Sequence, residues 1–377
     1  MMSLSLIVFL FASALTASSA SVPDDVTRSL KWDGGVFEWP CESTRSIFTS
    51  TGRYNPKSII ATRMQISRDT AYVALPRFKA GTPVTLGRID LTAKTCQPII
   101  APFPCWSLQE EGNCNALQNV VDIFLDINDV LWALDVGVVN TLEDQPIRRC
   151  PPKIVGFCVK TGKVVKVIDL SSLVCPASRL QYVVADVAQD GHTFLYVSDA
   201  ATRAVIVYDV QRSRGLRVVL PKAVTAGCGG RRDVLYLALV GQCGSGSGSV
   251  LYLTYLSSAS VFSIRTEYLR RGSSNGRLIA LGRKDAKVVI LGTDGGSNVF
   301  FRYEGRTEIY SWDTNKCFKS ENFVLVWKDD GCLLATHAVP DYKRGRMTLL
   351  QSNFHDYLQG TVGCGAVQAI ATIQGCF

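Results

Sequence analysis

Short apolar runs rich in β-branched and aromatic residues recur along the whole chain, and Gly, Asp, Asn and Pro residues bound them. A helical period of three to four residues is nearly absent. This pattern predicts an all-β protein, because short strands separated by turn-forming residues are typical of sheets. Six of the runs align as a rough repeat, with matching positions at Tyr72, Trp132, Tyr196, Tyr252, Val289 and Leu349.

Six such units predict a six-bladed β-propeller. Sheets arranged radially around an axis bury both faces of each blade and leave only short edges exposed. We expect residues 21–377 to form one such domain, with each of the six matching positions in a different blade. Two stacked β-sandwiches are the alternative architecture, which would explain the strands but not the recurrence of Asp or Asn at strand ends.

The first twenty residues carry no charge, and their apolar stretch ends in the small residues Ser18, Ser19 and Ala20. This arrangement predicts a secretory signal peptide over residues 1–20. The apolar stretch is too short to span a bilayer, so we expect no membrane association after cleavage. Thirteen cysteines fit an oxidising compartment. The chain is therefore expected to be secreted and extracellular, with most cysteines oxidised and at least one unpaired.

Composition narrows the function classes further. The hydrophobic fraction of 47% and the charged fraction of 19% are those of a globular protein. The net charge of +8 is spread along the chain, with no basic run, so a nucleic-acid partner is not expected. Known catalytic and nucleotide-binding motifs are missing, and three histidines form no ligand-like cluster in the sequence. We expect neither a metal nor a cofactor.

Polar residues end the apolar strands at matching places in four units, at Asp135, Asp199, Asp294 and Asn353. In a propeller, loops from all blades meet at the mouth of a central channel, which is the expected ligand site. These residues either cap their own turns or form a ring of acceptors suited to a cationic or catechol-like ligand. His337, in the last unit, is either a structural histidine or a weak candidate for a catalytic base.

Several longer strings appear in order along the chain: 54–59 (YNPKSI), 71–86 (AYVALPRFKAGTPVTL), 131–137 (LWALDVG), 150–154 (CPPKI), 195–199 (LYVSD), 206–209 (IVYD) and 336–339 (THAV). Together they resemble the Yellow and major royal jelly protein family of insects. The resemblance implies a secreted six-bladed propeller. It also implies one of two activities, because some members are linked to melanin and cuticle pigmentation, including dopachrome conversion, and others bind biogenic amines in the central channel.

The resemblance implies a small amine or catechol as the ligand, held by polar residues around the last blade. By motif position these residues are Thr336, Asn353 and Phe354, beside the strand-end carboxylates Asp135 and Asp199. An enzymatic member would move a proton from carbon to oxygen, which needs a base such as His337. A structural or nutritive extracellular protein is the alternative, since the fold does not decide between these functions.

The chain departs from the family pattern in its cysteines. No cysteine stands immediately before the segment Leu131-Trp132, where the family has one. The resemblance implies a disulfide to Cys150, and the partner of Cys150 therefore stays open.

Overall fold

A computed structural model describes residues 29–93, 95, 97–227, 233–241, 248–328 and 331–373 of the chain. The predicted signal peptide, residues 1–20, lies outside these ranges. Within them, no helix has the length and apolar character needed to cross a membrane.

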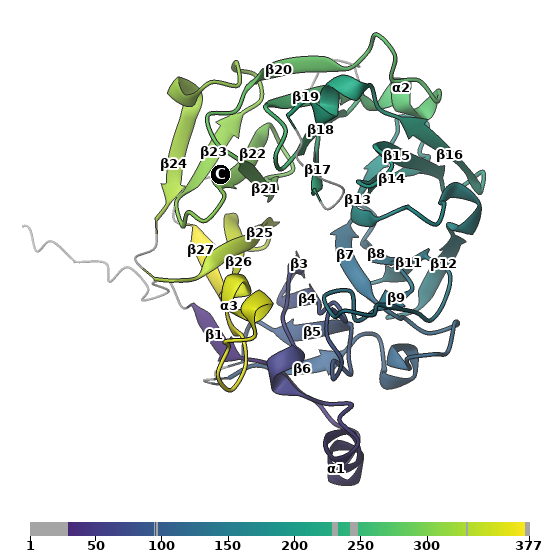
Figure 1. Cartoon of the computed structure of the whole chain (residues 1–377), viewed down its shortest axis with the longest axis vertical. Helices are drawn as coiled ribbons and strands as arrows, with labels where there is room; N and C mark the ends of the chain where they lie inside the picture. Colours follow the sequence, from purple (N-terminus) through teal and green to yellow (C-terminus); the bar gives the residue numbers. More distant parts are fainter. Residues whose placement is uncertain are drawn as a thin grey trace, which may run out of the picture.

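Six sheets stand around a central axis, as Figure 1 shows. Within each sheet the strands follow one another outward from the axis, and we number the sheets as blades 1 to 6. Blade 1 contains, from the axis outward, β3 (Arg63–Ser67), β4 (Thr70–Ala74), β5 (Leu86–Asp90), β6 (Ile99–Pro102) and β2 (Val36–Phe37). Blade 2 contains β7 (Val120–Leu125), β8 (Val130–Asp135), β11 (Lys153–Cys158) and β12 (Val164–Asp169). Blade 3 contains β13 (Leu180–Val187), β14 (Thr193–Asp199), β15 (Ala204–Asp209) and β16 (Arg214–Val219).

The second half of the ring repeats this order. Blade 4 contains β17 (Leu235–Val240), β18 (Val250–Tyr255), β19 (Ser260–Arg265) and β20 (Ile279–Arg283). Blade 5 contains β21 (Val288–Thr293), β22 (Asn298–Tyr303), β23 (Ile309–Asp313) and β24 (Phe323–Trp327). Blade 6 contains β25 (Leu334–Asp341), β26 (Arg346–Ser352), β27 (Val367–Ile373) and β1 (Leu30–Asp33). Neighbouring strands are antiparallel, except for the parallel pair β2 and β6.

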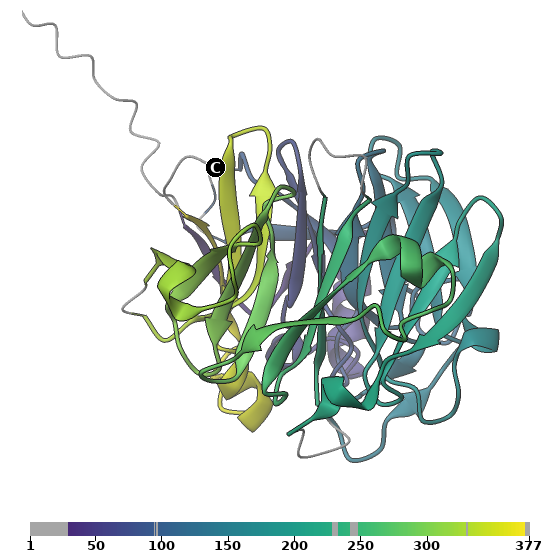
Figure 2. The same cartoon turned by 90° about the horizontal axis from the view of Figure 1, so that it is seen from above.

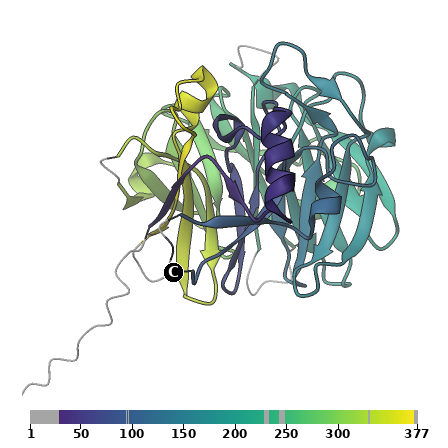
Figure 3. The same ribbon diagram turned by 90° about the horizontal axis from the view of Figure 1, so that it is seen from below.

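The remaining elements lie between the blades or at their ends. A two-stranded sheet pairs β9 (Val138–Val139) with β10 (Ile147–Arg148). The helices are α1 (Glu42–Ser50), α2 (Thr266–Arg270) and α3 (Phe354–Gln359), and the short 3₁₀ turns are η1 (Pro56–Ser58), η2 (Trp106–Gln109), η3 (Ser171–Leu173), η4 (Lys222–Thr225) and η5 (Ser320–Asn322). Helix α1 buries no residue and lies outside the ring beside blade 1, as Figure 3 shows.

The six-bladed propeller predicted from the repeat is confirmed. The six matching positions lie in six different sheets. The alignment was wrong in one unit, because Val289 lies on the inner strand β21 whereas the other five positions lie on second strands. The second strand of blade 5 is β22, where Phe300 and Phe301 are buried. This misplacement accounts for the short interval between Tyr252 and Val289.

The hydrophobic core fills the spaces between adjacent blades. One cluster joins Met64 and Val73 of blade 1 to Val339 and Leu350 of blade 6. Strand β14 is buried at every position, which explains its continuous apolar run. Burying one such aliphatic side chain contributes about 1.5–3 kcal/mol, so the faces between blades supply most of the driving force for closure.

The first and the last of the described strands close the ring together in blade 6. Strand β1 pairs with β27, with Leu30 opposite Ile370 and Asp33 opposite Val367. Next to this pair, the fully buried Gln368 accepts a hydrogen bond from the Ala61 amide at 2.6 Å and donates one to the Gly34 carbonyl at 2.6 Å. The junction is thus fixed by backbone pairing and by a buried amide.

A disulfide joins Cys114 to Cys150 across 36 residues of sequence. This finding identifies the partner of Cys150 that the sequence left open. Within the described ranges seven other cysteines are unpaired, at positions 41, 105, 158, 175, 317, 332 and 364. The expectation that most of the thirteen cysteines are oxidised is therefore wrong for pairing within the chain.

Candidate functional site

The inner strands enclose a central channel with a cavity at each end. All six inner strands run in one direction, so their first residues lie at one end of the channel and their last residues at the other. The front cavity, of about 540 Å³, lies at the first residues and is bordered by Phe354 of α3. The rear cavity, of about 470 Å³, lies at the last residues and is bordered by Tyr342 in the β25–β26 turn. Figure 2 shows α3 and this turn at opposite ends of the ring.

A layer of buried charges separates the two cavities, and Arg63 is its centre. Its Nη1 donates to the Thr336 carbonyl at 3.1 Å, and its Nε lies 3.4 Å from Asp122 Oδ1. The guanidinium carbon lies 4.3 Å from the ring centroid of Tyr182, which stacks on Tyr236 at 5.3 Å. The cation is therefore held by a carboxylate, a carbonyl and an aromatic face, all of which stabilise a buried guanidinium.

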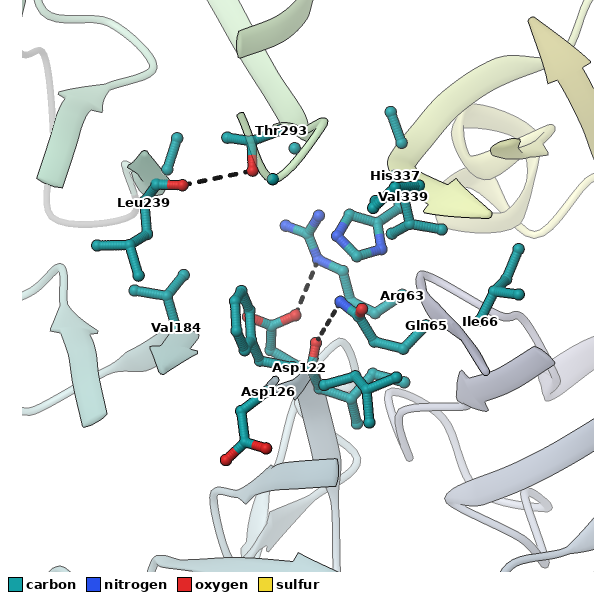
Figure 4. A pocket seen from close by; sticks show the side chains of 18 of the residues that line it. Arg63, Gln65, Ile66, Asp122, Asp126, Val184, Leu239, Thr293, His337 and Val339 are labelled. Carbon is teal, nitrogen blue, oxygen red and sulfur yellow. Dashed lines mark hydrogen bonds and ion pairs between the residues drawn. The ribbon is translucent and has the colours of Figure 1, made fainter. Parts of the chain in front are cut away.

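Asp122 lies on β7 and faces this layer, as Figure 4 shows. Its Oδ2 accepts a hydrogen bond from the Val183 amide at 2.7 Å. Burial raises the pKa of Asp122 to about 6, because the charged carboxylate loses hydration, and the charge of Arg63 opposes this rise.

We expect the contribution of Asp122 to the free energy of unfolding to increase as the pH falls from 7.5 to 4.5, because its carboxylate takes up a proton in the folded state. The pKa of about 6 in the folded chain exceeds the ordinary value of 3.8, so the folded state binds the proton more tightly. Between these two pH values, the free energy of unfolding of the wild type should rise by about 2 kcal/mol relative to that of Asp122→Asn. Denaturant titrations of both proteins at the two pH values measure this difference. A difference that stays constant, or that favours the wild type at the higher pH, contradicts the assignment.

His337 lies on β25 and borders the rear cavity. Its Nδ1 accepts a hydrogen bond from the Met64 amide at 3.0 Å. Burial and the nearby charge of Arg63 hold the pKa of His337 well below its usual value, so the ring is neutral and carries its proton on Nε2. Accepting a proton at Nε2 would require the other tautomer and the loss of the bond to Met64. The geometry thus favours a hydrogen-bond donor over the base suggested by the sequence.

Of the residues chosen by motif position, Thr336 and Phe354 both border the front cavity. The Thr336 hydroxyl donates to the Leu350 carbonyl at 3.3 Å. Asn353 does not line the cavity, and both ends of its amide are bonded. Its Oδ1 accepts from the Val367 amide at 2.8 Å, and its Nδ2 donates to Asp356 Oδ2 at 3.1 Å. Asn353 therefore positions the start of α3, and with it Phe354.

The expected ring of acceptors facing the axis is not present. Asp135 and Asp199 are fully buried at the ends of second strands, away from both cavities. The Asp199 carboxylate accepts from the Ser178 hydroxyl at 2.6 Å and from the Arg179 amide at 2.9 Å. Asp294 follows an inner strand and so lies at the opposite end of the channel. These carboxylates hold turns and neighbouring loops, which was the other interpretation of the same pattern.

Asp135 shows the same use of a carboxylate in more detail. Its oxygens accept from the amides of Gln118, Asn119 and Gly137 at 2.8–3.0 Å. The Lys153 ammonium lies 3.5 Å away. All of its acceptor positions face the protein, so it organises blade 2 rather than a ligand.

The front cavity is basic and aromatic, a feature that sequence reasoning missed. Its lining includes Arg63, Arg148, Arg179 and Arg302, and the described lining residues include no Asp or Glu. Arg302 donates through Nε to the Ala335 carbonyl at 2.8 Å, and burial lowers its pKa. The aromatic walls are formed by Phe78, Tyr182, Tyr236 and Phe354. Across the described ranges, no three His, Cys, Asp or Glu side chains gather as a metal site requires.

The fold and the site define a six-bladed β-propeller with a central channel that opens into a basic cavity. A family model described as "Major royal jelly protein" matches residues 118–373, which is more than half of the chain. The chain belongs to this family.

Individual relatives are similar over different lengths. Major royal jelly protein 8 of Apis mellifera is 22% identical over 333 residues, which cover 82% of this chain and 79% of that protein. Major royal jelly protein 1 of Apis mellifera is 22% identical over 324 residues, which cover 80% and 73%. A dopaminechrome tautomerase of Drosophila melanogaster is 30% identical over 173 residues, which cover 44% of this chain and 37% of that protein.

Proposed function

We propose that the chain is a secreted binding protein whose front cavity takes a small catechol-like ligand, in the chemistry of melanin and cuticle pigmentation. The observation that carries the proposal is the set of four arginines and four aromatic rings around a cavity of about 540 Å³. This volume is typical of sites for small molecules, which fill roughly 300–1,000 Å³. Guanidinium groups donate to catechol or quinone oxygens, and the rings stack on a planar ligand.

The charge of the cavity distinguishes between the two ligand types suggested by the sequence. An ammonium group in the front cavity would meet four guanidinium groups and no lining carboxylate. Repulsion between like charges in a partly buried site lowers the affinity. We therefore favour a catechol or its oxidised form over a ligand that depends on its amine.

Two further observations support this assignment. The name of the Drosophila relative assigns to it the tautomerisation of dopaminechrome, a catechol-derived compound. The uncharged apolar N-terminal segment supports secretion. The proposal concerns binding, and a tautomerase activity would also need a base beside the bound ring.

We expect 4-methylcatechol to bind more tightly than dopamine, because dopamine adds an ammonium group to the same ring. Replacing Phe354 with alanine should weaken 4-methylcatechol binding by about two- to tenfold, since an aromatic contact contributes roughly 0.5–1.5 kcal/mol. Isothermal titration calorimetry measures both effects. The matched control is Tyr342→Ala, which removes an exposed aromatic ring at the rear cavity and should leave catechol affinity unchanged.

Three outcomes would contradict the proposal. Tighter binding of dopamine than of 4-methylcatechol would show that the amine is recognised. Equal affinities of wild type and Phe354→Ala would place the ligand elsewhere. Absence of saturable binding by either compound would favour the structural or nutritive alternative.

A further inference from the structure

The rear cavity is a second cavity of the channel, and the proposed function does not use it. It lies among the last residues of the inner strands and the turns that follow them. Figure 4 shows Val184, Leu239, Ile66 and Val339 around it, so a large part of its wall is aliphatic. Its volume of about 470 Å³ is within the usual range for a small-molecule site.

The floor of the rear cavity carries charges that compensate one another. The cation of Arg63 lies 3.4 Å from the carboxylate of Asp122, and the imidazole of His337 is neutral. At the rim, Asp129 is paired with Lys160 at 2.7 Å and Lys343 is paired with Asp69. A further rim cation, Arg68, is exposed to solvent. The Arg63–Asp122 pair therefore offers no net charge to a ligand.

Two polar groups of the floor remain available for hydrogen bonds. His337 uses Nδ1 to accept from the Met64 amide, so the proton on Nε2 is the donor that it can offer. Gln65 uses Nε2 to donate to the Ile123 carbonyl at 3.2 Å, so Oε1 is the acceptor that it can offer. His337 on β25 is bonded to Met64 on β3, and Gln65 is the next residue of β3. The donor His337 and the acceptor Gln65 therefore lie on adjacent inner strands.

Asp126, the other acidic side chain labelled in Figure 4, uses both carboxylate oxygens in hydrogen bonds within the protein. Its Oδ1 accepts from the amides of Asn128 and Val130, and its Oδ2 accepts from the Trp132 indole at 2.8 Å. It closes the β7–β8 turn and leaves the recognition of a ligand to His337 and Gln65.

We propose that the rear cavity binds a second small ligand, a neutral molecule with an apolar body and a carboxamide-like group. The ligand carbonyl accepts from His337 Nε2, and the ligand N–H donates to Gln65 Oε1. The aliphatic wall covers the apolar body. An anionic ligand is disfavoured, because Arg63 is already paired with Asp122 and a buried anion without an opposite charge loses its hydration without compensation.

A titration followed by ¹⁹F NMR tests this site with 4-fluorobenzamide as the probe and 4-fluorobenzoate as its charged counterpart. We expect saturable binding of the amide to the wild type and weaker binding of the benzoate. Replacing Leu239, which lines only the rear cavity, with tryptophan should weaken amide binding at least about tenfold by filling the space. The matched control is Val289→Trp, which fills only the front cavity and should leave amide affinity within about twofold.

The two cavities give separate readouts, so failure at one does not imply failure at the other. Binding of 4-methylcatechol and the thermal melt show whether Leu239→Trp is folded. Should that variant not fold, Gln65→Met removes the acceptor with little change in volume, and weaker amide binding is again expected. Absence of saturable amide binding to the wild type would overturn the proposal. Two other results would also overturn it. One is loss of amide binding in Val289→Trp but not in Leu239→Trp, and the other is tighter binding of 4-fluorobenzoate than of 4-fluorobenzamide.

Discussion

Replacing Arg77 with methionine is expected to lower the free energy of unfolding by at least about 4 kcal/mol, because five buried carbonyl groups lose their donor. The Arg77 side chain is 2% exposed. Its guanidinium donates to the carbonyls of Thr82, Pro83, Gln109, Leu117 and Gln118. Burial lowers its pKa to about 10, so the group remains charged at neutral pH. One side chain thus holds together the loops that lead from blade 1 to blade 2.

Denaturant unfolding of the purified variants measures this effect. Arg77→Lys should recover little of the stability, because an ammonium has three donors and cannot reproduce the planar fork of five. The matched control is Arg45→Met on the exposed helix α1, which should change the free energy of unfolding by less than about 0.5 kcal/mol. An Arg77→Met protein as stable as the wild type would contradict this role.

Replacing Asp135 with alanine is expected to lower the free energy of unfolding by about 3–5 kcal/mol, the usual effect of removing one partner from a buried ion pair. The substitution leaves the Lys153 ammonium without its carboxylate and three backbone amides without their acceptor. The affinity for 4-methylcatechol, measured at a temperature where the variant is folded, should stay unchanged. Calorimetric binding and thermal melts on the same samples separate the two effects.

Asp169→Ala provides the matched control for Asp135. Asp169 also ends a strand of blade 2, but it is exposed and accepts from the Ser171 amide and hydroxyl. Its loss should lower the free energy of unfolding by roughly 0.5–1 kcal/mol, as expected for one exposed turn. Weaker catechol binding with unchanged stability in Asp135→Ala would restore the interpretation of Asp135 as a ligand-binding residue.

The blade count could be predicted because second strands are buried on both faces. A strand such as β14, buried from Thr193 to Asp199, contains an uninterrupted apolar run at residues 194–197. Inner strands give a weaker signal, since each forms the edge of its sheet that borders the channel. Strand β13 accordingly mixes Gln181, Tyr182 and Asp186 with aliphatic residues. In blade 5 the apolar run used in the sequence alignment lies on the inner strand β21. The alignment matched this run to the second strands of the other blades, so the matching position in blade 5 is one strand too early.

Residues of the candidate site could be predicted only where they belong to a longer sequence motif of the family. The family resemblance selected Thr336 and Phe354, and both border the front cavity. Arg63, Asp122 and Arg302 come from different blades and occur singly in the sequence, so no local spacing could bring them together. An aspartate at the end of an apolar strand has the same local pattern whether it binds a ligand or a turn, which is why the sequence left both roles open for Asp135 and Asp199.

The closure of blade 6 constrains when the ring can be completed during synthesis. Residues 30–33 leave the ribosome more than 300 residues before their partner strand, residues 367–373. Until then β1 has no ladder to join, because its only paired neighbour is β27. A nascent chain that has made five blades is therefore still an open ring with an unpaired strand at its beginning. Synthesis of β27 is therefore the step that allows this open ring to close.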